Sequence, residues 1–352
     1  AFEDCAFIEL ICPYSVESVA DYAFAYCDTL EKVSLSATNI GTYAFANCPK
    51  LICATVGAIT TVPQGLFQNC TSLSVVSLPW NTQYIDSKAF ENCSSLEFID
   101  LPESITHIAP GAFNGCSSLK YFSGKYANEA GNMLINEGHL MHYAPGYEND
   151  VCTIPDGITY IDEYAFYNCD NVRLVNMPES LQVIGDYAFC DCNSLASLTI
   201  PESVMEIRND AFRSCWKLDV YFKSESPEYT TVPTLNMAEY CAADEIRLFV
   251  PNESVEAYKT YWSELAPYIY GYGYVENPRP YDYQIWYSSF EKMMLNPAAV
   301  NQTLISNEWD RSSGRGVLTF DGTVTEINGP LFANGYALVS INTVSYTHLR
   351  AH

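Results

Sequence analysis

The chain has 352 residues and is strongly acidic: aspartate and glutamate outnumber lysine and arginine by 42 to 17, and the formal net charge is −25 at pH 7. A field of this sign repels phosphate backbones, so we expect no nucleic-acid partner and favour basic or cation-bridged ones. No apolar run approaches the roughly 18 residues of a membrane-spanning helix, so we expect no membrane span in this sequence.

A Phe-x-x-Cys signature recurs along most of the chain. Successive phenylalanines of the signature are separated by 22, 21, 22, 23, 23, 53, 23 and 23 residues. A fixed period of about 20 to 50 residues indicates a solenoid, because one unit cannot bury its apolar face alone and stacks on copies of itself. The predicted core markers are Phe2/Cys5, Phe24/Cys27, Phe45/Cys48, Phe67/Cys70, Phe90/Cys93, Phe113/Cys116, Phe166/Cys169, Phe189/Cys192 and Phe212/Cys215.

The coil that starts at Cys93 shows what one repeat does physically. Apolar residues follow at Leu96, Ile99 and Leu101, and the step of two between the last pair is the period of a β-strand. Pro102 has no N–H to donate and closes the strand. Two further apolar positions direct a second short segment at the same core. Strands that recur once per coil in one direction predict a parallel ladder.

Nine of the fourteen cysteines lie in this register, where we expect small, buried side chains with weak S–H donors. Stacked disulfides between coils are an alternative that this register does not require. No pair of Cys-x-x-Cys elements suggests zinc, and we expect no metal or other cofactor. The five cysteines outside the register are Cys12, Cys53, Cys152, Cys190 and Cys241.

Coils such as Leu195 to Cys215 and Val172 to Cys192 contain the pattern Leu-x-x-Ile-x-Ile-Pro-x-Ser-Val-x-x-Ile-Gly-x-x-Ala-Phe-x-x-Cys, with some variation. This pattern resembles the BspA-like leucine-rich repeats of bacterial surface proteins, and the resemblance covers residues 1 to about 222. It implies a right-handed, horseshoe-like leucine-rich-repeat solenoid, mainly of parallel β-strands with short loops or helical turns, in coils of 21–23 residues. It also implies export from the cell, and adhesion or recognition rather than catalysis.

The long interval between Phe113 and Phe166 predicts an insertion at about residues 122–151. Within it, residues 131–143 have the pattern of a β-hairpin with a three-residue loop that ends in a glycine of positive φ, Gly138. His139 and His142 lie three apart on the returning strand and therefore point to opposite faces, which makes a poor metal pair.

After Cys215 the pattern decays into a predicted capping unit at about residues 223–275, which ends a first array of residues 1–275. Residues 246–251 form its last expected strand, and residues 254–262 its helix, capped by Asn252 or Ser254. An atypical terminal unit of this kind covers the exposed end of a repeat core.

Residues 276–316 are predicted to be a linker and the β cap of a second array, with strands at 284–289, 304–307 and 316–322. Residues 317–343 resemble the first coil of that array. Residues 344–352 have no repeat register and are interpreted as a non-native tail. The sequence does not begin with methionine, so we expect a piece of a longer protein whose absent start carried any signal peptide.

No catalytic motif is recognisable, and we expect no catalytic residues. Glu103, Glu179 and Glu202 follow strand prolines and are expected to form a solvated acidic edge rather than a cation site.

The outer face of the strands is the better candidate for binding. If the fifth and seventh positions after each cysteine share that face, Val75, Phe98 and Tyr121 form an apolar lane on three consecutive coils, with Asp100 beside it. The alternative is that the insertion after Tyr121 folds over this lane.

We therefore predict a non-enzymatic surface or secreted protein that binds a protein or other macromolecule on host or neighbouring cells. Two alternatives stay open, namely a structural spacer for a further domain and the non-catalytic part of a larger exported enzyme.

Overall fold

The computed structural model describes residues 2–215, 218–230, 247–272, 284–289, 304–310, 315–320 and 338–342. These residues belong to two compact units. The first unit consists of Ala1–Leu195, Pro201–Trp216 and Thr230–Glu245, and the second of Ala196–Ile200, Lys217–Tyr229 and Ile246–His352.

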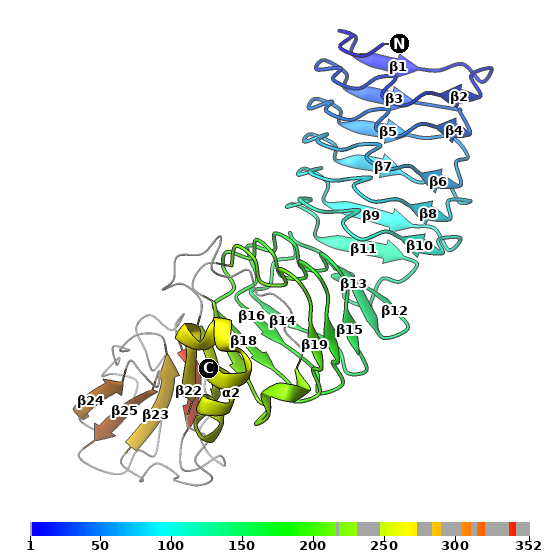
Figure 1. The fold of residues 1–352 in the computed structure, drawn as a ribbon. Coiled ribbons are helices and arrows are strands. Elements are labelled where there is room, and N and C mark those ends of the chain that lie inside the picture. Colours follow the sequence, from blue (N-terminus) through cyan, green and yellow to red (C-terminus); the bar gives the residue numbers. More distant parts are fainter. Residues whose placement is uncertain are drawn as a thin grey trace. The chain divides into compact units, whose positions relative to one another are not determined.

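The first unit is a solenoid in which each coil contributes two short parallel strands (Figure 1). Neighbouring coils pair in register one period apart, as Val33 faces Ala54 and Ala54 faces Val76. The strands of the first row are β1 (Glu9–Ile11), β3 (Lys32–Ser34), β5 (Cys53–Thr55), β7 (Val75–Ser77), β9 (Phe98–Leu101) and β11 (Tyr121–Gly124). Those of the second row are β2 (Ser18–Val19), β4 (Asn39–Ile40), β6 (Thr61–Val62), β8 (Tyr84–Ile85) and β10 (His107–Ile108). The predicted parallel-strand solenoid is confirmed.

The marker phenylalanines form a column inside the solenoid. Phe90 is fully buried and stacks on Phe67 at 5.7 Å and on Phe113 at 5.4 Å between ring centroids. The same stacking recurs from Phe2 to Phe45 and from Phe166 to Phe212. Each ring thus covers the next, and all the marker phenylalanines from Phe24 to Phe212 are buried. The predicted burial of Phe2 is wrong, because this first ring of the column is stacked only on Phe24 among the described residues and stays 53% exposed.

The marker cysteines from Cys27 to Cys215 are small buried side chains, as predicted, whereas Cys5 is only partly buried. The Cys93 thiol donates to the carbonyl oxygen of Phe67, with an Sγ–O distance of 3.2 Å. The thiols of Cys27, Cys48, Cys70, Cys116, Cys192 and Cys215 repeat this bond to earlier phenylalanine carbonyls. All thirteen cysteines in the described part of the chain are free thiols.

The corner before each cysteine requires a left-handed backbone. Asn47, Asn69 and Asn92 have φ between 58° and 60°, a region that asparagine tolerates better than most residues. Their amides bond to one another, with Nδ2–Oδ1 distances of 2.7 Å from Asn69 to Asn47 and 2.8 Å from Asn92 to Asn69. The side chains therefore form a ladder along the outside of the corner.

The insertion is one long coil rather than an interruption of the array. Its hairpin consists of β12 (Met133–Asn136) and β13 (His139–Tyr143), and β13 pairs in parallel with β15 (Tyr160–Ile161) of the next coil. The expected positive φ of Gly138 is confirmed at 84°, but the loop has two residues instead of three, because Glu137 also has a positive φ, of 48°. A pair of such residues matches the twist of the flanking strands.

The solenoid continues after the insertion with the same two rows. In the first unit, β14 (Val151–Thr153) pairs with β16 (Leu174–Asn176), while β15 pairs with β17 (Val183–Ile184) and β17 with β19 (Glu206–Ile207). Cys152 is buried at the centre of β14, as expected for its strand position.

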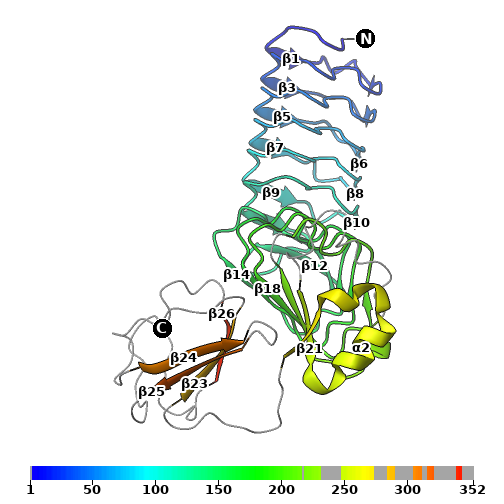
Figure 2. The ribbon, with the colours of Figure 1, turned by 60° about the vertical axis from the view of Figure 1, so that its left-hand side comes forward.

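The second unit contains a parallel ladder and the predicted helix (Figure 2). Its strands follow the order β18 (Ser197–Ile200), β20 (Asp219–Phe222), β21 (Arg247–Pro251) and β22 (Ile269–Tyr272). A 3₁₀ turn η1 spans Pro227–Tyr229, and η2 (Asn252–Ser254), α2 (Val255–Tyr261) and η3 (Ser263–Tyr268) connect β21 to β22. Ser254, one of the two expected capping residues, is the N-cap residue of α2, but its side chain makes no cap hydrogen bond, and the η2 turn leads directly into α2.

An ion pair lies inside the second unit. Arg247 Nε and Nη2 donate to the two carboxylate oxygens of Asp219 at 2.9 and 3.0 Å. Burial raises the pKa of Asp219 to about 7, although the guanidinium opposes this rise. Asp219 and Arg247 are partners in the register of β20 and β21, so this two-pronged pair joins the two strands.

The remaining described strands form an antiparallel sheet in the order β24 (Leu304–Asp310), β25 (Arg315–Phe320), β23 (Gln284–Ser289) and β26 (Leu338–Asn342). The three strands expected in the β cap are present. Residues 276–283, 321–337 and 343–352, which include most of the linker, the expected coil and the tail, lie outside the described residues. The domain limits at 275, 316 and 343 stay predictions.

Candidate functional site

Val75, Phe98 and Tyr121 lie side by side on the outer face of the first row of strands. Phe98 pairs directly with Tyr121, and Val75 occupies the corresponding position on β7. The three side chains are 55%, 48% and 49% exposed, whereas the intervening Ile99 is buried. The fifth and seventh positions therefore do share the outer face. We call these three residues the apolar lane.

Polar groups border the apolar lane. Asp100 lies opposite Ser123 on the neighbouring strand and accepts a hydrogen bond from its hydroxyl. Lys120 Nζ lies 3.7 Å from a carboxylate oxygen of Glu97 and 3.5 Å from one of Glu148. An apolar centre with a polar rim has the composition of a protein contact surface.

The insertion touches one end of the apolar lane without burying it. Tyr147 contacts Tyr121 edge to face, with 6.2 Å between ring centroids, and the carbonyl of Gly131 accepts the N–H of Phe122. Tyr121 nevertheless keeps about half of its surface exposed. The lane therefore stays exposed to solvent at this end.

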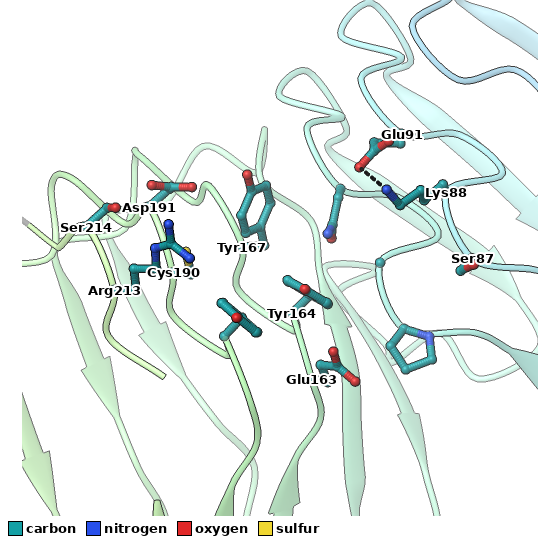
Figure 3. Close-up of a pocket in the computed structure, with 14 residues that line it drawn as sticks. Ser87, Lys88, Glu91, Glu163, Tyr164, Tyr167, Cys190, Asp191, Arg213 and Ser214 are labelled. Atoms are coloured by element: carbon teal, nitrogen blue, oxygen red, sulfur yellow. Dashed lines mark ion pairs between the residues drawn. The ribbon is translucent and has the colours of Figure 1, made fainter. Parts of the chain in front are cut away.

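A second candidate site is a groove of about 620 Å³ that is lined by the corner loops of five coils of the first unit (Figure 3). Lys88 and Glu91 lie on one wall, and Asp191 and Arg213 lie on the other. Tyr167 stands between these walls in Figure 3. We call this site the tyrosine groove.

The rings of the tyrosine groove support one another. Tyr164 stacks on Tyr187 with 5.1 Å between centroids and an interplanar angle of 11°, and Tyr167 meets Tyr164 edge to face at 5.7 Å. Burial raises the pKa of Tyr167, and its neighbour Asp191 adds to the rise, so this phenol stays protonated at neutral pH. Through these two contacts the three rings pack against one another along the groove.

The sequence alone did not indicate the tyrosine groove. Its tyrosines at 164 and 187 lie two residues before a marker phenylalanine, as do Tyr22 and Tyr43, which also stack on each other. That recurrence was the available signal. It gives no reason for a groove, which depends on the distance that the insertion introduces between coils.

The histidines and acidic residues that the sequence offered as possible metal ligands lie in different surroundings. His139 is exposed and bonds Asp162, with 2.8 Å between Nδ1 and Oδ1, whereas His142 is buried against the ring of Phe113. Glu103, Glu179 and Glu202 are exposed. Within the described residues, no three His, Cys, Asp or Glu side chains are grouped so that they could hold a metal ion. No helix in the same residues has the length and apolarity needed to cross a bilayer.

Comparison with known proteins agrees with the repeat architecture. Among solved structures, the chain is similar to a leucine rich cell surface protein from Faecalibacterium prausnitzii, with 23% identity over 61% of this chain and 73% of that chain and a TM-score of 0.47. A leucine-rich repeat protein from Bacteroides ovatus gives 20% identity over 78% of this chain and 70% of that chain, with a TM-score of 0.52. No curated protein matches the sequence.

The sequence also matches a family model directly. The model of the BspA type leucine rich repeat region matches six copies over residues 1–120 and 148–247, which is more than half of the chain. The chain therefore belongs to the BspA-type leucine-rich repeat family.

Proposed function

We propose that this chain is a non-catalytic recognition module that binds a protein on host or neighbouring cells, from the surface of the producing cell or after secretion. The observation that carries the proposal is the exposure of Val75, Phe98 and Tyr121 on three neighbouring coils. Exposed apolar side chains cost solvation free energy in the unbound chain. A partner that covers these side chains removes that cost.

The charge of the chain narrows the class of partner. With a net charge of −25, the chain attracts basic surfaces and repels acidic ones at long range. The carboxylate of Asp100 beside the apolar lane adds the same preference locally, whereas that of Glu97 is paired with Lys120. We therefore propose a partner with an apolar patch inside a basic rim.

A pull-down from serum and purified matrix proteins tests this function. The chain is expected to retain a partner, and Phe98→Ala and Tyr121→Ala are each expected to weaken retention at least tenfold. Leu174→Ala is the matched control, because Leu174 has the same strand position beyond the insertion and is also partly exposed.

Two outcomes would contradict the proposal. A chain that retains no partner would behave as a spacer. Retention that persists unchanged in both lane variants would place the contact elsewhere on the molecule.

A further inference from the structure

The tyrosine groove exists because the array opens at the insertion. Main-chain bonds join the corner loops of neighbouring coils, as from the N–H of Phe90 to the carbonyl of Ala112, and this pattern resumes from Tyr143 to Ala165. The loop that contains Pro110, Gly111 and Asn114 forms one side of the groove, and the loop from Glu163 to Tyr167 lies across from it. Five corner loops, two before the insertion and three after it, thus line one concave site.

We propose that the tyrosine groove binds a neutral oligosaccharide, with the ring of Tyr167 as the platform for a pyranose face. The rings of Tyr164, Tyr167 and Tyr187 offer apolar surface, and the walls offer side-chain donors and acceptors. A pyranose has the matching form, because its C–H groups make an apolar face while its hydroxyls lie around the edge. Aromatic rings with convergent polar groups are typical of small-ligand sites.

The charges of the groove favour a neutral ligand. Three carboxylates (Glu91, Glu163 and Asp191) face two cations (Lys88 and Arg213), so the charges nearly cancel. Lys88 Nζ also lies 3.9 Å from a carboxylate oxygen of Glu91 in its own wall. An anionic ligand would meet the carboxylates, and a basic peptide would meet a cation on each wall. Hydroxyl groups bond with both kinds of side chain without a net charge.

The size of the groove agrees with a short oligosaccharide. Its volume of about 620 Å³ lies within the roughly 300–1,000 Å³ of ligand pockets. The walls come from coils on both sides of the insertion, so a linear chain of a few sugar rings would span them. The stacked pair of Tyr164 and Tyr187 is already in place, so little side-chain ordering opposes binding.

An array of defined glycans tests the proposal with the full chain. The neutral probes are maltoheptaose, cellohexaose, xylohexaose and mannohexaose. Sialylated and sulfated glycans and hexa-arginine represent anionic and cationic ligands. We expect binding to at least one neutral probe, a dissociation constant at least tenfold higher for Tyr167→Ala, and a value within threefold of the parent for Tyr167→Phe, which keeps the ring.

The controls separate a lost site from a lost fold and from the apolar lane. Tyr22→Ala removes a stacked tyrosine outside the groove and is expected to leave glycan binding unchanged, as is Phe98→Ala. Thermal unfolding confirms that Tyr167→Ala is folded. Three outcomes would each overturn the proposal. The chain could bind none of the neutral probes, or it could bind only the anionic or cationic probes. The third is equal affinity of Tyr167→Ala and the parent.

Discussion

The ring of Tyr143 stacks on that of Phe166, with 5.0 Å between centroids and 22° between the planes. Tyr143 precedes Phe166 by 23 residues, which is the ordinary period, and its N–H bonds Ala165 as a marker phenylalanine would. Tyr143 is therefore the marker of the inserted coil. The interval of 53 residues consists of one coil of 30 and one of 23.

The role of Tyr143 as a marker predicts how the stability of the first unit responds to mutation at this position. Tyr143→Phe restores the marker of the other coils and is expected to change the free energy of unfolding by less than about 1 kcal/mol. Tyr143→Ala leaves a cavity beside Phe166 and is expected to cost about 3–5 kcal/mol. Urea unfolding followed by fluorescence measures both variants. Equal losses in the two variants would show that the ring does not carry the stacking.

Two phenylalanines in consecutive coils, Phe90 and Phe98, give a contrast between core and surface. Phe90 is fully buried within the column, whereas Phe98 is about half exposed in the apolar lane. Phe90→Ala is expected to cost about 3–5 kcal/mol and Phe98→Ala less than about 1 kcal/mol. Thermal unfolding of the two variants checks the order. A loss for Phe98→Ala as large as that for Phe90→Ala would mean that the lane belongs to the core.

The asparagine ladder predicts an unusual ranking at position 69. Asn69 has a φ of 60° and bonds both Asn47 and Asn92. Asn69→Gly loses the bonds but accepts the backbone, while Asn69→Ala also meets the left-handed penalty of about 1–2 kcal/mol. We therefore expect glycine to be the less harmful replacement. A lower melting temperature for Asn69→Gly than for Asn69→Ala would contradict this explanation.

The cysteines are expected to differ in their reactivity. Burial raises the pKa of the Cys116 thiol to about 12, which leaves almost no thiolate at pH 8, and its side chain is fully buried. Cys53 is partly exposed on β5. Iodoacetamide followed by peptide mass mapping should label Cys53 in the folded chain, and Cys116 only after denaturation. Rapid labelling of Cys116 in the folded chain would contradict the burial of the marker cysteines.

His142 makes the first unit sensitive to acid. Burial lowers the pKa of His142 to about 4, so the fold favours the neutral ring. This contribution is complete above the ordinary histidine pKa of about 6.5 and is lost as the pH falls from there towards 4, up to a total of about 3 kcal/mol. The melting temperature of the parent should therefore fall more steeply than that of His142→Phe between pH 7 and pH 4. Parallel curves for the two proteins would show that His142 does not titrate in this range.

The sequence by itself determined the repeat, because the Phe-x-x-Cys period requires each coil to bury the same side chains against its neighbours. It also indicated the outward positions of Val75, Phe98 and Tyr121, since strand alternation is a local property. The hairpin was recognisable from its turn glycine, Gly138.

Only the tertiary structure decided the rest. A tyrosine serves as the marker of the inserted coil because an aromatic ring of similar size fills the same space, which a search for Phe-x-x-Cys does not detect. Lys88 and Tyr167 line the same groove although they lie on opposite sides of the insertion, and this arrangement follows from the distance that the long coil sets between corner loops. Such a distance is a property of packed coils and is not encoded in any one of them.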